Sequence, residues 1–332
     1  MNHPALVPAT KAACTLSVIV PLLNEQEVLP LLHQRLMAAL QGIEGGFEVV
    51  YVDDGSTDAS PLVLRSLAQQ HPELSLIRFS RNFGKEQAMS AGLQLARGAA
   101  VIIIDADLQH PPELIPQMLQ AWQGGADVVN MKRRSRSEEA WIKREGAQLF
   151  YRVINSLSET PIPADVGDFR LLSRRAVDAL NQLPERGRFM KGLFSWIGFP
   201  QVTLDYDVAD RAAGQTKWKL RQLWRFAAEG ITAFSIAPLK LASKVGLLSA
   251  LIAFASGIYF LVRTLLFGDP VAGFPTLIVA VLMLGGLQLI AIGVLGEYLG
   301  RLWLESKRRP LFLIQDYLPA AQFQARSDAD HG

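Results

Sequence analysis

The sequence has almost no cysteine, since Cys14 is the only one in 332 residues. A single thiol excludes an internal disulfide framework and fits a reducing compartment, where we expect Cys14 to be inert. The sequence also lacks an excess of charge of either sign, because 33 basic and 31 acidic residues leave a formal net charge of +2. This balance gives no support to a nucleic-acid partner. The length leaves room for about two domains.

Internal repeats, low-complexity segments and a cleavable leader are not visible either. The apolar run at 16–23 (LSVIVPLL) is too short to span a bilayer and continues into NEQE. We therefore expect this run to be the first core strand, and the domain that follows to stay inside the cell.

Two long uncharged blocks are present instead, at 245–262 (VGLLSALIAFASGIYFLV) and at 274–295. As a helix, with a rise of 1.5 Å per residue, either block can cross a hydrocarbon layer of about 30 Å. Basic residues such as Lys244 and Arg301 flank the outer ends, and the intervening GDPVAG loop has none. The positive-inside rule then places both outer ends in the cytoplasm. A buried helical hairpin of a soluble protein is the alternative.

Strand-like and helix-like segments alternate through the first two-thirds of the chain. Strands are expected at 16–22, 47–53, 74–80, 101–107 and 127–133. Helices are expected at 27–40, at 59–69, at 84–98 with Gly98 as the end, and from Pro111 or Pro112 onward. Such alternation predicts an α/β fold with a mainly parallel sheet and helices on both faces.

The most informative segment is 101–112 (VIIIDADLQHPP), in which a β-branched run ends at Asp105 and Asp107. Ligands of open α/β sheets bind beyond the carboxyl ends of the strands. Two carboxylates there repel each other unless they share a cation, and Mg²⁺ or Mn²⁺ typically takes one or two carboxylates plus substrate phosphates. The segment predicts a divalent metal shared with a phosphorylated substrate, with solvated acids at a strand end as the alternative. We expect His110 to be a loop residue rather than a third metal ligand.

A second strand end, at 49–52, leads into Asp53, Asp54 and Gly55. Glycine permits a tight turn here, and an acid can accept hydrogen bonds from a base or from ribose hydroxyls. On its own this is also a good turn sequence, in which Asp58 can cap the next helix.

Several motifs in this order resemble the family-two glycosyltransferases of the GT-A fold. They are PLLNEQE at 21–27, VDDGSTD at 52–58, RNFGKEQAMSAGL at 81–93 and DADLQHPPE at 105–113. Within that group the chain is similar to the polyprenyl-phosphate hexosyltransferases, which include dolichol-phosphate mannose synthases and, more closely, bactoprenol (undecaprenyl-phosphate) glucosyltransferases. This closer likeness is carried by the two-span tail and by VGDFRLLSRRAVDAL at 166–180, PERGRFMKGLFSWIGF at 184–199 and RAAGQTKW at 211–218. It extends over the chain from about residue 15.

The resemblance implies roles for particular residues. The nucleotide-sugar contacts it implies are Pro21, Glu25, Val52, Asp54, Asp105 and Ala106, with Arg211 and Lys217 on the donor phosphates. Asp107 and Gln109 would hold the Mg²⁺ or Mn²⁺ ion. Arg133 and Arg144 fall where the family places acceptor-phosphate arginines, although Arg134 and Arg136 leave that register open.

The implied chemistry is a displacement at an anomeric carbon. Negative charge builds on the leaving diphosphate and oxocarbenium character on the ring, so fixed cations at the diphosphate lower the barrier. A lipid phosphate monoester has a second pKa near 6 and needs no proton removed at neutral pH. Asp168, or else Asp165, lies where relatives with alcohol acceptors keep a base. Here we expect it to orient Arg170, a loop or the sugar, with a structural cap as the alternative.

The predicted function is inverting transfer of glucose from UDP-glucose to undecaprenyl phosphate, giving a β-linked product for cell-envelope glycan modification. Mannose, N-acetylglucosamine or aminoarabinose donors are alternatives, and a non-catalytic membrane scaffold is an alternative of another class. A processive polysaccharide synthase is disfavoured, because QLWRF at 222–226 does not match Gln-x-x-Arg-Trp and the spans are too few. The expected location is the bacterial inner (plasma) membrane, multi-pass, with the catalytic domain and both termini cytoplasmic.

The expected organisation has four parts: a GT-A domain at 1–215, a juxtamembrane amphipathic region at 216–240, two transmembrane helices at 241–300 and a tail at 301–332. Basic and aromatic residues interleave at 217–234, which favours a helix lying on the bilayer, with a helix packed on its own domain as the alternative. The apolar tail RPLFLIQDYL predicts a strand that pairs with a sheet edge, such as that of a neighbouring subunit. A homo-oligomer, with a tetramer as one form, is therefore expected.

Overall fold

The computed structural model describes residues 14–134, 166–207, 237–267 and 273–321. They divide into an α/β unit, to which the residues from 309 onward belong, and a helical unit that holds the two long C-terminal helices.

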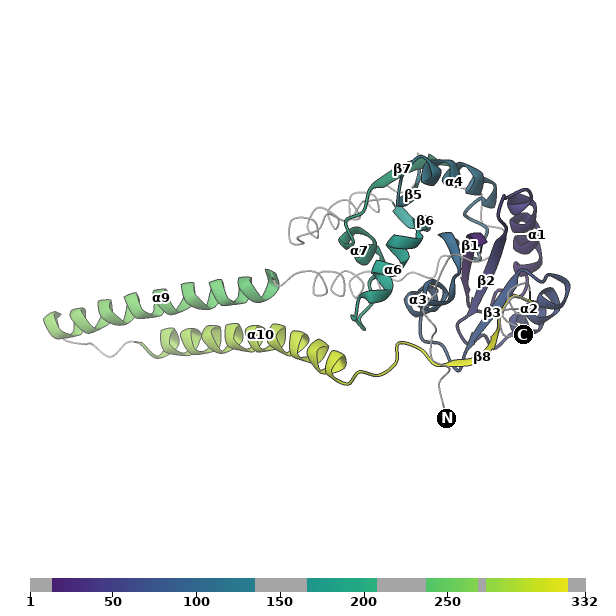
Figure 1. The fold of residues 1–332 in the computed structure, drawn as a ribbon. Coiled ribbons are helices and arrows are strands. Elements are labelled where there is room, and N and C mark those ends of the chain that lie inside the picture. The colour runs from purple at the N-terminus through teal and green to yellow at the C-terminus, as the bar shows by residue number, and fades with distance from the viewer. Residues whose placement is uncertain (1–13, 135–165, 208–236, 268–272, 322–332) are drawn as a thin grey trace. The chain divides into compact units, whose positions relative to one another are not determined.

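The α/β unit is one mixed sheet flanked by helices (Figure 1). The strands are β1 (Cys14–Leu22), β2 (Phe47–Asp53), β3 (Leu74–Phe79), β4 (Gly98–Ile103), β5 (Val128–Arg133), β6 (Val166–Ser173), β7 (Gln201–Tyr206) and β8 (Ile314–Leu318). The helices are α1 (Leu29–Leu40), α2 (Ser60–Gln70), α3 (Lys85–Leu95), the 3₁₀ turn η1 (Pro112–Leu114), α4 (Ile115–Gln123), α6 (Arg174–Gln182) and α7 (Met190–Trp196).

The strand order is β7-β5-β6-β4-β1-β2-β3-β8. Its centre, β4-β1-β2-β3, is parallel as predicted, whereas β6 runs antiparallel to β4 and β5, and β8 antiparallel to β3. The helices lie on both faces: α3 and α6 contact each other and pack on one face, while α1 contacts α2 and α4 on the other. The sheet is therefore more mixed than predicted, because β6, which was not predicted as a strand, lies between β4 and β5 and runs antiparallel to both.

The central strand β1 is buried along nearly its whole length, as expected for a parallel strand covered on both faces. Leu16, Val18 and Val20 join the apolar core beneath α1, and Ile19 points to the opposite side. There α3 approaches so closely that a Cβ on Gly92 would lie 2.4 Å from Ile19 Cγ2. Glycine inside this helix therefore serves close packing of helix on sheet.

Gly98 does not end the preceding helix, as the sequence had predicted. Helix α3 stops at Leu95, and Gly98 is the first residue of β4. A Cβ there would lie 2.4 Å from the Ser17 backbone nitrogen, and the Gly98 N–H donates to Ser17 Oγ at 2.7 Å. Glycine is needed because β4 begins in close contact with β1.

The C-terminal tail forms the predicted edge strand, but the edge belongs to its own chain. Strand β8 pairs with β3, with Leu318 opposite Leu76. Phe312 stacks on Phe79 with ring centroids 5.0 Å apart, and Asp316 pairs with Arg65 at 2.9 Å. Because the pairing is internal, it does not itself require a neighbouring subunit.

We expect the apolar contact, rather than the ion pair, to hold the tail on the sheet. Phe312→Ala should lower the Tm of the α/β unit by about 3 to 6 °C, because a stacked aromatic pair and its buried area are lost. Asp316→Ala should change it by about 1 °C at most, since exposed ion pairs contribute little. Differential scanning fluorimetry of the full chain in detergent measures both, and equal shifts would contradict the assignment.

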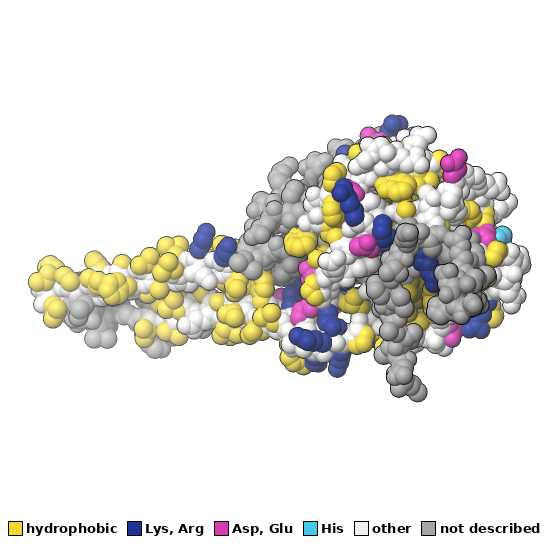
Figure 2. Space-filling model, viewed as in Figure 1, with side chains coloured by type: hydrophobic (Ala, Val, Ile, Leu, Met, Phe, Trp, Pro, Cys, Tyr) yellow, Lys and Arg dark blue, Asp and Glu magenta, His cyan; other side chains and the backbone are white. Residues whose placement is uncertain are grey.

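The helical unit contains α9 (Ala237–Phe267) and α10 (Phe274–Ser306), which contact each other. Within the described residues, two segments are long and apolar enough to cross a membrane, Leu239–Tyr259 and Met283–Ser306, and neither is buried inside the protein. Figure 2 shows hydrophobic side chains along both helices. A buried hairpin of a soluble protein is therefore wrong, and the unit is suited to membrane association. The helix expected at 217–234 lies outside the described residues.

Candidate functional site

Most predicted site residues gather where the parallel strands β1, β2 and β4 end. Pro21 of β1 lies opposite Val52 of β2. The chain leaves β4 at Ile103 and reaches Asp105 two residues later. Because parallel strands end at the same sheet edge, segments far apart in the sequence meet here. This edge holds Pro21, Glu25, Val52, Asp54, Asp105 and Ala106.

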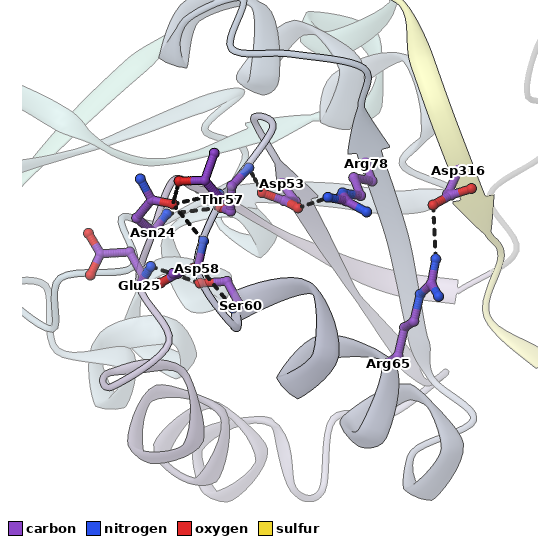
Figure 3. A network of polar contacts seen from close by, with 10 residues as sticks. Asn24, Glu25, Asp53, Thr57, Asp58, Ser60, Arg65, Arg78 and Asp316 are labelled. Atoms are coloured by element: carbon purple, nitrogen blue, oxygen red, sulfur yellow. Dashed lines mark hydrogen bonds and ion pairs between the residues drawn. The ribbon is translucent and has the colours of Figure 1, made fainter.

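The loops after β1 and β2 are tied together by polar contacts (Figure 3). Asn24 adopts a left-handed backbone conformation, with φ 57°, and its Oδ1 accepts the Thr57 N–H at 2.8 Å. The Glu25 N–H donates to Ser60 Oγ at 2.9 Å. Asp58 accepts the Ser60 N–H at 2.9 Å at the start of α2, although the N-cap position itself is Ala59. These bonds fix the Glu25 backbone beside the sheet edge.

Gly55 makes the tight turn that was predicted after β2. Its φ is +76°, and a Cβ would lie 2.5 Å from the Arg81 carbonyl carbon. Next to it, Asp54 accepts the N–H groups of Phe83 and Gly84 at 2.7 and 2.9 Å. Burial raises the pKa of Asp54 although both N–H groups oppose this. Asp54 thus connects the carboxyl edge of the sheet to the loop that leads into α3.

A lysine joins the two central carboxylates. Lys85 Nζ lies 2.6 Å from Asp105 Oδ1 and 2.5 Å from Asp168 Oδ2. Burial opposes ionisation of both acids, but Lys85 and His110 together outweigh it at Asp105 and hold the pKa of that carboxyl well below its usual range. The Lys85 ammonium likewise lowers the pKa of Asp168. The two carboxylates are therefore held ionised in one cluster.

Sequence reasoning missed Lys85, although it lies inside the motif RNFGKEQAMSAGL. Its position at the start of α3 was the available signal, but nothing in the sequence shows that Asp168, 83 residues later, faces it. Asp168 was expected to orient Arg170, a loop or the sugar. Arg170 donates instead to the Gly167 carbonyl at 2.7 Å and stacks on the Phe194 ring.

His110 lies in the loop after β4, as expected, but it is 1% exposed and fixed on two sides. Its Nδ1 lies 2.6 Å from the hydroxyl of Tyr206, the last residue of β7, and its Nε2 lies 3.4 Å from Asp105 Oδ2. The Phe169 ring packs 5.2 Å from the imidazole. Tyr206 carried no signal in the sequence.

Asp107 and Gln109 are brought together by a sharp turn. Between them Leu108 is buried with φ 60°, and the Gln109 N–H donates to Asp107 Oδ1 at 3.1 Å. Arg133 Nη2 reaches Gln109 Oε1 at 3.5 Å. A left-handed non-glycine residue is a strained conformation that functional sites often retain.

The donor set at this turn fits a hard divalent cation. Asp107 and Gln109 supply oxygen atoms, which Mg²⁺ and Mn²⁺ prefer. Burial raises the pKa of Glu25, and the nearby negative charge of Asp107 raises it further, so a cation would relieve repulsion here. In the described ranges no three His, Cys, Asp or Glu side chains converge to hold a metal alone.

The remaining predicted residues lie outside the described part of the chain. They are Arg144, Asp165, Arg211 and Lys217. Cys14 is described and fits the prediction of an inert thiol, because burial raises its pKa to about 12.

Glu86, beside the cluster of Lys85, Asp105 and Asp168, leads to a prediction about how the stability of the fold depends on pH. Burial, and then the negative charge of Asp168, raises the pKa of Glu86 from 4.5 to about 7. The folded state therefore favours the protonated acid, and this contribution to stability is lost as pH rises through 7. Glu86→Gln keeps the oxygen that accepts the Met190 N–H at 3.0 Å. It should raise the Tm clearly at pH 8 and little at pH 5, and equal shifts at both pH values would contradict this.

Comparison with known proteins identifies related sequences. Residues 17–180 match the model of glycosyl transferase family 2, and residues 237–302 match that of the GtrB C-terminal hairpin. The chain is 45% identical over 301 residues to the bactoprenol glucosyl transferase of Shigella phage SfV, covering 91% of this chain and 98% of that one. It is 44% identical over 302 residues to the prophage bactoprenol glucosyl transferase homolog of Escherichia coli K12, covering 90% and 98%.

A solved structure is also similar, at lower identity. Glucosyl-3-phosphoglycerate synthase from Mycobacterium tuberculosis, in complex with Mn²⁺, UDP and phosphoglyceric acid, is 20% identical with a TM-score of 0.49. The similarity covers 70% of this chain and 82% of that one.

Proposed function

Because the chain belongs to glycosyltransferase family 2 and its α/β unit has the predicted GT-A fold, we propose that it transfers glucose from UDP-glucose to undecaprenyl phosphate. One observation carries the proposal. The likeness to bactoprenol glucosyl transferases runs through both the catalytic unit and the apolar hairpin, so it includes the parts that would bind the donor and the lipid. The site at the carboxyl edge of the sheet supplies the acids that a nucleotide-sugar enzyme of this kind needs.

The donor would bind at that edge. Its nucleoside would contact Asp105 and Ala106 after β4, with Pro21 and Val52 on the adjoining strands. The Glu25 N–H donates to Ser60 Oγ and the Asp54 carboxylate accepts the Phe83 N–H, which keeps this part of the pocket in place before the donor arrives.

Asp107 and Gln109 would hold Mg²⁺ or Mn²⁺ on the donor diphosphate. Such an ion, when bound, neutralises the charge that grows on the leaving group. Arg211 and Lys217, placed by the family resemblance, would contact the same phosphates. Arg133 and Arg144 would face the acceptor phosphate, and Arg133 already reaches the Gln109 side chain.

The reaction is a direct displacement. A phosphate oxygen of the lipid forms a bond to the anomeric carbon while the bond to UDP breaks, and the electron pair leaves with UDP. Attack from the opposite face turns an α-linked donor into a β-linked product.

Asp168 is not needed as a base in this scheme. The acceptor phosphate is already ionised near neutral pH. Lys85 lowers the pKa of Asp168, which makes it a weak proton acceptor, and the same contact fixes its position. We therefore assign Asp168 a positioning role at the sugar end of the site. Asp168 acts there through its contact with Lys85. Asp165, in the same segment, is the alternative residue for this role.

The helical unit would anchor the enzyme in the bacterial plasma membrane. Two helices that cross the membrane, with basic residues at their outer ends, would leave the catalytic unit and both termini in the cytoplasm, next to the lipid headgroup. The homo-oligomer expected from the tail stays a prediction, which mass photometry of the detergent-solubilised chain can test.

The test is transfer by the purified full chain with undecaprenyl phosphate and, separately, UDP-glucose, UDP-N-acetylglucosamine, GDP-mannose and UDP-aminoarabinose. We expect turnover with UDP-glucose and a β-configured product by NMR. Preference for another sugar would overturn the donor assignment but keep the reaction class. No turnover with any donor, despite nucleotide binding, would favour the membrane scaffold.

A further inference from the structure

His110 lies between a tyrosine and the central acid cluster, on the side of Asp105 opposite to Lys85. Lys85 Nζ lies 2.6 Å from Asp105 Oδ1, and His110 Nε2 lies 3.4 Å from Asp105 Oδ2. The two oxygens of one carboxylate therefore have different cationic or hydrogen-bonding partners. Such an arrangement fixes both the position and the plane of the carboxylate.

The groups beside the two ring nitrogens decide which of them carries the hydrogen. The Tyr206 hydroxyl lies 2.6 Å from His110 Nδ1, and the Asp105 carboxylate lies beside Nε2. An ionised Asp105 can only accept a hydrogen bond, so Nε2 of a neutral imidazole must carry the hydrogen and Nδ1 must accept. The phenol is then the donor. Burial raises the pKa of Tyr206, which keeps the phenol protonated and able to donate.

The surroundings leave the imidazole little freedom. His110 is 1% exposed, its ring centroid lies 5.2 Å from that of Phe169, and a Cβ on Gly167 would lie 3.6 Å from its Cε1. The sequence between Asp105 and His110 is also bent by the strained turn at Leu108. The imidazole is thus held by packing and by its tyrosine, and its Nε2, which meets no hydrogen-bond acceptor at full hydrogen-bond geometry in the described residues, lies 3.4 Å from Asp105 Oδ2.

We propose that His110, held by Tyr206 in the tautomer that carries hydrogen on Nε2, is a positioning residue that orients the Asp105 carboxylate for the donor nucleoside. The role rests on the proposed function, since it assumes that Asp105 contacts the donor. His110 acts only through Asp105 and touches neither the sugar nor the lipid phosphate. Its loss should therefore weaken donor binding while leaving the acceptor unaffected.

The test compares four variants of the full chain in detergent. His110→Leu and Tyr206→Phe should weaken UDP-glucose binding, measured by isothermal titration calorimetry, by about tenfold or more, because the polar contact of His110 Nε2 with the charged Asp105 is lost or misdirected. In His110→Leu the KM for UDP-glucose should rise similarly, and the KM for undecaprenyl phosphate should change less than about twofold. Tyr206→Phe is compared for donor binding alone, because the Tyr206 hydroxyl also interacts with Arg133. His110→Gln can still present an N–H to Asp105 and should recover most of the affinity.

Tyr51→Phe is the matched control, because the Tyr51 hydroxyl lies 3.2 Å from Nδ1 of the buried His33 in the same unit. We expect it to leave donor binding unchanged. Wild-type affinity in His110→Leu would overturn the proposal, as would a loss in His110→Gln as large as in His110→Leu. If wild-type protein binds no UDP-glucose, the proposed function fails instead.

Discussion

Replacing Asp107 with asparagine should reduce glucosyl transfer by at least about 100-fold. The carboxylate is the only charged side chain in the predicted metal pair, and a neutral amide would hold a divalent ion on the diphosphate far less well. The same loss is expected for wild-type enzyme treated with a chelator, and added Mg²⁺ or Mn²⁺ should restore it. Release of UDP, followed in a coupled assay across a metal titration, measures both effects.

Asp178→Asn is the control for this experiment, because Asp178 is an exposed acid on α6 that pairs with Arg174 at 3.6 Å. It should retain full activity. UDP-glucose consumption that continues undiminished in Asp107→Asn, or in the presence of chelator, would show that the acids after β4 do not act through a divalent ion.

Lys85→Met should lower kcat by about tenfold to 100-fold. Without the ammonium, Asp105 and Asp168 lose the one cation that the described structure places between them, and two neighbouring carboxylates repel each other. One of them should then be protonated or displaced near neutral pH. Lys85→Arg should keep part of the activity, because it restores charge with a different geometry. Steady-state kinetics at fixed metal concentration distinguish the three enzymes.

A double variant shows whether the loss comes from this repulsion. In Lys85→Met/Asp168→Asn only one carboxylate remains charged, so the second substitution should cost less than it does in the wild-type background. Arg65→Met is the control, since Arg65 pairs with one exposed acid on β8, at the sheet edge away from the site. Strictly additive losses would contradict a shared cluster.

Much of the fold could be predicted because its signals are local. The apolar runs of β1, β2, β3 and β4 are continuous, the helices between them are periodic, and the two long uncharged blocks exceed what a soluble core requires. The end of β2 at Asp53 follows from the turn sequence after it, whereas β4 ends at Ile103 and not at Asp107 as expected. The prediction failed at Gly98, where the need for glycine comes from the neighbouring strand and not from the helix before it.

The candidate site likewise contains residues whose proximity the sequence predicts and residues whose proximity it does not. Asp105, Asp107 and Gln109 stand within five residues, so their proximity could be inferred from the motif itself. Lys85 and Tyr206 could not, because their partners lie 83 and 96 residues away along the chain. The sequence also could not predict which sheet edge the tail pairs with, since an unpaired strand does not specify its partner.

The sequence by itself determined the parallel centre of the sheet, the acids at its carboxyl edge and the two apolar helices, because hydrophobic periodicity and turn residues act over a few positions. Only the tertiary structure decided that Lys85 joins Asp105 to Asp168, that His110 is buried against Tyr206, and that β8 completes its own sheet. Those contacts depend on the way in which strand order and helix packing bring distant residues together. No local pattern encodes that information.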